Sequence, residues 1–221
     1  MKHFNMNMKI FVQYVIGIII LTLGIAFTIQ SKFGASPYDA LLVGLFNTIG
    51  LSVGSWEVLV ALVILICNAI LQKTRPEIFG LLTAIITGIG IDVWLFLLGN
   101  YLIPVQWYFE LICFLIGLIL IGLGTTIYLR AKFAPMPVDL LMLVISDLTK
   151  LNLLWSRTII YFVFLVLAFV FHGPIGLGTI LTVLLGGTII NFFMMFFDKR
   201  EMKMQIIRNT EIDKRFSDRE V

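Results

Sequence analysis

Apolar residues along this chain occur in six long runs separated by short polar segments. Helices are the predicted structure, because the alternation typical of strands is absent and lipid offers no partner to an open backbone group. About 20 apolar residues cross the roughly 30 Å of bilayer hydrocarbon. The pattern therefore predicts an all-α polytopic membrane helix bundle with six transmembrane helices, over residues 10–29, 53–71, 78–98, 107–129, 153–171 and 178–197.

Two further apolar runs, 37–51 and 137–148, are too short to cross a bilayer. At 1.5 Å per residue, helices of these lengths reach only about 18–22 Å. Each is expected to be either a re-entrant helix, which enters and leaves the membrane on one side, or an interfacial helix. The sequence leaves that choice open.

Composition supports a membrane domain. Of the 221 residues, 60% are apolar and 13% are charged, whereas soluble domains carry about 25% charged residues. With a mean hydropathy of +1.03, a soluble globular protein is excluded, and a net charge of only +3 does not indicate nucleic-acid binding. We expect one membrane domain over 1–197 and a charged cytoplasmic tail over 198–221.

The distribution of Lys and Arg predicts the orientation. With six spans and a cytoplasmic N-terminus, Lys32 alone of the 16 Lys and Arg residues lies outside, in agreement with the positive-inside rule. If both short runs crossed fully, the basic residues of 73–75 and 130–132 would lie outside as well. We therefore expect six spans with both termini in the cytoplasm.

The two halves of the chain repeat one another. Shifted by 100 residues, segments 16–41 and 116–141 are identical at ten positions, including the pattern Lys-Phe-x3-Pro-x-Asp. Apolar composition alone would not repeat that pattern. Because each half, 10–98 and 107–197, holds an odd number of spans, the second is expected to be inverted relative to the first, as in many secondary transporters.

The segments LTLG in the first span, SKFGASPYDAL after it and GLSVGSW further on resemble the YczE/YyaS/YitT-type family of bacterial multi-pass membrane proteins, and its YczE-like branch in particular. The resemblance covers most of residues 10–197. In the second repeat, Ala134 and Pro135 replace Gly34 and Ala35 of the first. The resemblance implies a protein of a bacterial plasma membrane, described as a membrane protein or permease, with a regulatory role in secondary-metabolite production in one branch.

Two segments have the pattern of a helix start. In the first, Ser36 fits the N-cap, Pro37 the first turn and Asp39 the third position; Pro137 and Asp139 repeat the pattern without the Ser. In one interpretation, each Asp only binds free backbone amides at the helix start. In the other, both short helices are re-entrant, and the two Asp side chains line a water-filled pocket.

Asp92 lies deep in the third span, about 21 Å from its cytoplasmic end. A carboxylate at that depth costs about 2.5–3.5 kcal/mol or more unless it is paired or hydrated, so Asp92 is either functional or bonded to a neighbour such as Asn68. The repeat places Asp39 and Asp92 toward the outside and their mates Asp139 and Asn191 toward the inside. We hypothesise an outer vestibule lined by the first pair and an inner one lined by the second, exposed in alternation.

Glu57 and Arg157 lie one turn inside opposite membrane faces, each beside a Trp. Long charged side chains in such places usually extend to the interface and leave their charge in water. We therefore expect both to snorkel and assign neither to the site.

Together these features predict a secondary transporter or permease for a small solute, with proton coupling as an option. The alternative is a non-transporting scaffold or regulator that acts through its cytoplasmic loop and tail. An enzyme is not expected: the segment ending at Asp92 is one residue too long for the GxGD motif of intramembrane aspartyl proteases, which moves the Asp about 100° around the helix. No cofactor or metal motif is found in the sequence. The expected partners are the lipid bilayer and a small solute or proton. Homo-oligomers are compatible with the sequence.

Overall fold

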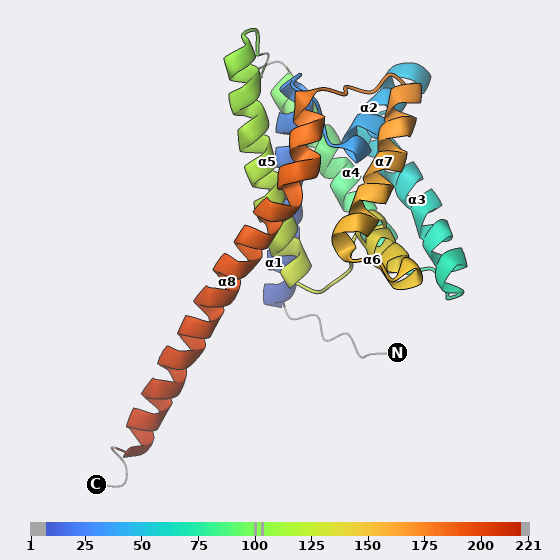
Figure 1. The fold of residues 1–221 in the computed structure, drawn as a ribbon. Coiled ribbons are helices and arrows are strands. Elements are labelled where there is room, and N and C mark those ends of the chain that lie inside the picture. Colours follow the sequence, from blue (N-terminus) through green and yellow to red (C-terminus); the bar gives the residue numbers. More distant parts are fainter. Residues whose placement is uncertain (1–7, 100, 103, 218–221) are drawn as a thin grey trace.

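The computed structural model describes residues 8–99, 101–102 and 104–217. These residues form eight helices and no strand: α1 (Met8–Gln30), α2 (Pro37–Ile49), α3 (Val53–Gln72), α4 (Ile78–Gly99), α5 (Trp107–Arg130), α6 (Pro137–Thr149), α7 (Leu153–Val170) and α8 (Leu177–Ser217). The all-α class is confirmed, and α8 extends well beyond the rest of the bundle (Figure 1).

The helix bounds agree with the predicted ones within two residues at every end except one. Within the described part of the chain, α1, α3, α4, α5 and α8 are long and apolar enough to cross a membrane. The sixth expected span is α7, whose apolar stretch Leu154–Val170 is shorter, so its crossing stays a prediction. The last apolar run was expected to end at residue 197, and α8 continues beyond it into the charged tail, because no Pro or Gly follows that could stop the helix.

The outer surface of the bundle is apolar. Large apolar side chains are exposed along several helices, among them Ile66, Phe96, Phe162, Phe169, Leu184 and Phe192. Soluble monomers rarely expose apolar area on this scale, whereas lipid accepts it. Together with the helices that are long enough to cross, this surface identifies a multi-pass membrane protein.

Helices α1 and α5 form an antiparallel central pair (Figure 1). Glycines let the two backbones touch: a Cβ on Gly17 would lie 2.5 Å from the amide nitrogen of Tyr128, and one on Gly24 would lie 2.7 Å from the carbonyl oxygen of Gly117. A Cβ on Gly124 would lie 2.8 Å from the carbonyl oxygen of Gly17. The contacts are reciprocal, because Gly17 and Gly24 are the repeat mates of Gly117 and Gly124.

The two short helices lie at opposite ends of the bundle (Figure 1). We call the end at which α1 begins the N-end and the opposite end the far end; α6 lies at the N-end and α2 at the far end. Each packs against the other half of the chain: a Cβ on Gly44 of α2 would lie 2.8 Å from the carbonyl oxygen of Phe171, and Asn68 of α3 donates a 2.9 Å hydrogen bond to the carbonyl oxygen of Pro137. Residues 37–45 of α2 are buried, so α2 enters the bundle and does not lie along its surface.

The helix pairs α3–α4 and α7–α8 correspond in the repeat but pack differently. In the first pair the backbones touch, since a Cβ on Gly54 would lie only 2.0 Å from the carbonyl oxygen of Gly88. In the second pair Gly187, the repeat mate of Gly88, faces the side chain of Arg157, whose Nη1 lies 3.0 Å from the position of a Cβ. A charged side chain therefore separates α7 from α8 where α3 and α4 are in direct contact.

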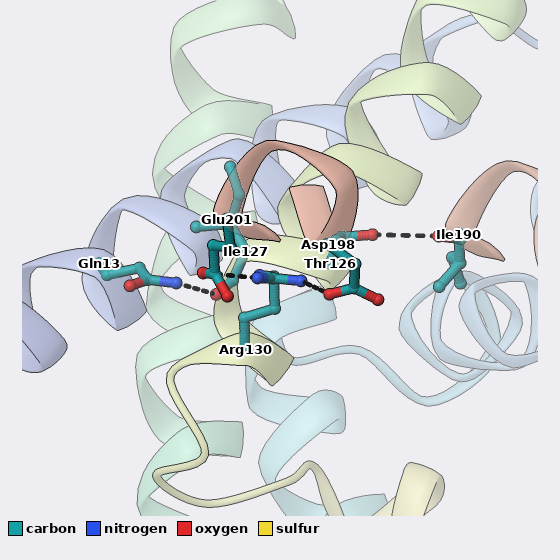
Figure 2. Close-up of polar contacts among 7 residues, drawn as sticks. All are labelled: Gln13, Thr126, Ile127, Arg130, Ile190, Asp198 and Glu201. Atoms are coloured by element: carbon teal, nitrogen blue, oxygen red, sulfur yellow. Dashed lines mark hydrogen bonds and ion pairs between the residues drawn. The ribbon is translucent and has the colours of Figure 1, made fainter. Parts of the chain in front are cut away.

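Arg130 at the end of α5 holds α8 where that helix leaves the bundle (Figure 2). Its guanidinium forms ion pairs with Asp198 and, at 2.6 Å, with Glu201, and lies 5.7 Å from the ring centroid of Phe197. Single exposed ion pairs contribute about 0–1 kcal/mol, but these three contacts act on one turn of α8. They connect the end of α5 to α8 at the point where α8 leaves the bundle.

Candidate functional site

A cavity of about 460 Å³ lies where the starts of α2 and α6 approach α7 and α8. Four charged side chains line it: Asp39 of α2, Glu57 of α3, Asp139 of α6 and Arg157 of α7. Most of the other lining residues are apolar. Ionisable groups inside a membrane domain are costly and usually mark a substrate or ion pathway, so this cavity is the candidate functional site.

The cavity extends toward the N-end of the bundle, between α7 and α8. Leu129 near the end of α5 and Leu154 near the start of α7 both line it. Asn191 of α8 lines the same region and is itself exposed. Toward the far end, by contrast, the backbones of α3 and α4 are in direct contact at Gly54 and Gly88.

The start of α2 is built as the sequence predicts. Ser36 is the N-cap, Pro37 lies in the first turn, and the Asp39 amide donates a 3.1 Å hydrogen bond to the Ser36 hydroxyl oxygen. The same hydroxyl donates at 2.6 Å to the Asp39 carboxylate. Asp39 is only 5% exposed, so the cap fixes its carboxylate at the cavity wall.

The start of α6 lacks the capping Ser of α2. Met136 occupies the N-cap position before Pro137, and no side chain caps the helix. Asp139 accepts a hydrogen bond from the hydroxyl of Tyr128 on α5. Both repeat-related Asp residues thus line one cavity, but only the first belongs to a closed capping arrangement.

Glu57 is not at the membrane interface, and the expectation that it snorkels is wrong. It is 2% exposed and lines the cavity together with Tyr38 of α2. Tyr38 in turn packs at 5.1 Å between ring centroids against Phe164 of α7. The packing of α2 between α3 and α7 turns this face of α3 inward, which the apolar sequence of α3 does not reveal.

Arg157 also points into the bundle, contrary to the expected snorkelling. Its Nη2 donates a 3.0 Å hydrogen bond to the Tyr161 hydroxyl, and the guanidinium carbon lies 4.9 Å from the Tyr161 ring centroid. The guanidinium faces the backbone of Gly186 and Gly187 on α8. The signal that could have identified Arg157 and Glu57 is the one applied to Asp92, an ionisable group inside a span.

Asp92 does not line the cavity. Its carboxylate accepts hydrogen bonds from the Ser52 hydroxyl at 2.5 Å and from the Gly54 amide at 2.8 Å, and thereby ties α4 to the start of α3. The expected bond to Asn68 is not formed, because Asn68 donates to the start of α6. The structure differs from the two predicted vestibules: Asp39 shares one cavity with Asp139 and Asn191, whereas Asp92 binds to the start of α3 at the far end. The functional roles of these residues stay predictions.

The cavity brings three carboxyl groups near one another. Asp39 and Asp139 both lie within electrostatic range of Glu57. No cluster of His, Cys, Asp and Glu in the described residues is arranged to hold a metal ion. Because like charges in an apolar cavity are unfavourable unless they are neutralised, this arrangement is suited to binding protons or an organic cation.

Comparison with known sequences assigns the chain to a family. Residues 8–195 match a family described as "Family of unknown function (DUF6198)". The chain belongs to this family. The match begins with α1 and extends into α8, so it includes every charged residue of the cavity.

Three relatives match most of the chain. The chain is 59% identical over 184 residues to "Uncharacterized protein YyaS" of Bacillus subtilis, with 83% of this chain and 92% of YyaS aligned. It is 35% identical over 182 residues to "Uncharacterized membrane protein YczE" of the same organism, with 81% and 82% aligned. An "Uncharacterized protein" of Haemophilus influenzae is 26% identical over 175 residues, with 79% and 78% aligned. The predicted resemblance to YczE and YyaS is confirmed, with the higher identity to YyaS; no solved structure matches.

Proposed function

We propose that this protein is a secondary carrier for a small solute that bears a positive charge, with protons on the cavity carboxyl groups as the coupling ions. The observation that carries the proposal is the cavity itself, which lies within the membrane domain, holds three carboxyl groups and extends toward one end of the bundle. A cavity of about 460 Å³ is within the usual size range of small-molecule sites. A packed scaffold would have no need of these buried charges.

The carrier has six transmembrane helices in two inverted repeats, with α2 and α6 as re-entrant helices. The reciprocal contacts support this part of the proposal: Gly17 meets Gly124, and Gly24 meets Gly117, across an antiparallel pair. A two-fold axis in the membrane plane relates contacts in this way. The positions of the two short helices at opposite ends agree with the same axis (Figure 1).

The positive-inside rule then makes the N-end cytoplasmic and the far end extracytoplasmic, in a bacterial plasma membrane with both termini inside. With this orientation, the molecule is closed to the outside by the contact of α3 with α4 and open toward the cytoplasm between α7 and α8. One repeat is thus closed while the other is open, which is the asymmetry that alternating access requires.

Single cysteines at Lys32 and Lys132 test the inverted arrangement. Both side chains are exposed, and both residues follow a central-pair helix. In a background without Cys67 and Cys113, we expect a membrane-impermeant maleimide added to intact cells to label the cysteine at 32 and to label the one at 132 only after lysis. Labelling of both from the same side contradicts the inverted repeat.

Proton release tests the carrier itself. We expect the purified protein in weakly buffered detergent to release protons when it binds an ammonium solute, since a cation and a proton compete for the same carboxyl groups. The panel consists of choline, glycine betaine, pentylamine and 5-aminopentanoate, each read with a pH-sensitive dye and by calorimetry. If none of the four solutes binds and none causes proton release, the proposal is contradicted.

The second candidate is a scaffold or regulator that binds a protein partner on the cytoplasmic side. The continuation of α8 to Ser217, beyond the bundle and held by Arg130, favours it (Figures 1 and 2). This function does not need the cavity. A protein truncated after Phe197 separates the two, because a carrier keeps its solute binding and a scaffold loses its partner.

A further inference from the structure

Arg157 is the one basic residue among the described residues that line the cavity. In the described part of the chain its guanidinium forms no ion pair with a carboxylate, although Asp139 is within electrostatic range. Its Nε is buried and has no hydrogen-bond partner among the described residues. A guanidinium has five donors in a rigid fork suited to a carboxylate, and here that fork is incompletely used.

Of the two short helices whose starts line the cavity, α6 is the one without a side-chain cap. In α2, the Ser36 hydroxyl accepts from the backbone and donates to Asp39, so that end is satisfied within the protein. In α6, Met136 offers no such group. The first turn of α6, with no side-chain cap from Met136, therefore presents its backbone amides and the positive end of the helix dipole at the cavity wall.

The two sides of the cavity thus differ in the charge they can bind. Asp39 and Glu57, from α2 and α3, present carboxyl groups. Arg157 and the start of α6, from the second repeat, present a cation and backbone donors beside Asp139, whose carboxyl group accepts a hydrogen bond from Tyr128. A third unused group is the Thr87 hydroxyl, which is buried, lines the cavity and has no partner in the described residues.

We propose that the solute is a zwitterion, with its ammonium group at Asp39 and Glu57 and its carboxylate at Arg157 and the start of α6. This inference rests on the proposed carrier function and specifies its substrate class. A carboxylate would complete the guanidinium fork and occupy the open helix start, as anions do at half-helix ends in transporters. The positive group would neutralise the opposite side.

The competing explanation is that Arg157 only neutralises Asp139 and does not bind the solute. In that case a cation without a carboxylate binds at least as well as its zwitterionic counterpart. The two explanations therefore predict opposite orders of affinity for a zwitterion and its matched cation. This comparison can be made on the native protein.

Matched solutes make this comparison. Glycine betaine and choline share a trimethylammonium group, and 5-aminopentanoate and pentylamine share a primary ammonium group; only the first of each pair carries a carboxylate. We expect calorimetry on the purified full chain to give about 10- to 100-fold tighter binding of the zwitterion in at least one pair, the factor that one charged hydrogen-bonded contact contributes.

The variants assign that preference to the guanidinium. Arg157→Gln should remove the preference for the carboxylate without weakening the binding of the matched amine, and Arg157→Lys should restore part of that preference. Arg75→Gln is the matched control, because Arg75 is exposed and does not line the cavity. Each variant is compared after size-exclusion chromatography confirms a monodisperse protein.

The outcomes separate this inference from the carrier proposal. Amines that bind as tightly as the zwitterions, or a preference that survives Arg157→Gln, overturn the zwitterion and leave a cation carrier. Absence of binding by all four solutes, with no proton release, overturns both. A zwitterion preference lost in Arg157→Gln and retained in Arg75→Gln supports both.

Discussion

Replacing Asp39 by Asn should abolish most of the proton release on solute binding and weaken the binding itself at least about 30-fold. The Asp39 carboxyl group lines the cavity on the side proposed for the ammonium group and is held by a hydrogen bond from Ser36. Removing one partner of a buried, hydrogen-bonded charge pair typically costs about 2 kcal/mol or more. Calorimetry and dye-detected proton release, on variants purified in parallel, measure both effects.

Asp92→Asn is the matched control for this prediction. It makes the same chemical change to an intramembrane carboxylate that bonds to Ser52 and Gly54 and does not line the cavity. We expect its solute affinity and proton release to stay within about twofold of the native protein, while its thermal stability falls because the far-end bonds weaken. If Asp92→Asn abolishes proton release and Asp39→Asn does not, the assignment of the site to this cavity is wrong.

The helices were predictable because a bilayer imposes a length and a composition on anything that crosses it. The Pro and Asp at the start of each short helix were equally informative, since they mark a first turn whether or not lipid is present. The end of α8 was not predictable from apolar length. The residues after Phe197 include many good helix formers and no Pro or Gly, so the helix continues into its charged segment.

The members of the site were predictable only in part, because a span that is apolar on all sides carries little information about its rotation. Three of the predicted site residues line the cavity: Asp39, Asp139 and Asn191. Asp92, the deepest carboxylate in sequence, faces α3, whereas Glu57, which seemed close enough to the interface to snorkel, faces the interior. Depth follows from counting residues along a helix, but the direction of a side chain depends on which helices pack around it.

Two alanine substitutions at repeat-related glycines should have very different effects. A Cβ on Gly88 would lie 2.5 Å from the carbonyl oxygen of Gly54, a backbone atom that cannot move without separating α3 from α4. A Cβ on Gly187 would meet only the far end of Arg157 at 3.0 Å. We expect Gly88→Ala to lower the free energy of unfolding by about 1–3 kcal/mol, the usual cost of overpacking, and Gly187→Ala to change it by less than about 0.5 kcal/mol.

Thermal denaturation in detergent measures the stability difference, and labelling distinguishes a closed gate from a simple packing contact. Val53 lies at the start of α3 and is buried at 5% exposure. If the contact between α3 and α4 closes the extracytoplasmic end, a cysteine at 53 should react faster with an external, impermeant maleimide in the Gly88→Ala background than in the Gly187→Ala background. Equal labelling with unequal stability would mean that the contact holds the bundle together without closing it, and would remove the main support for alternating access while leaving the binding cavity intact.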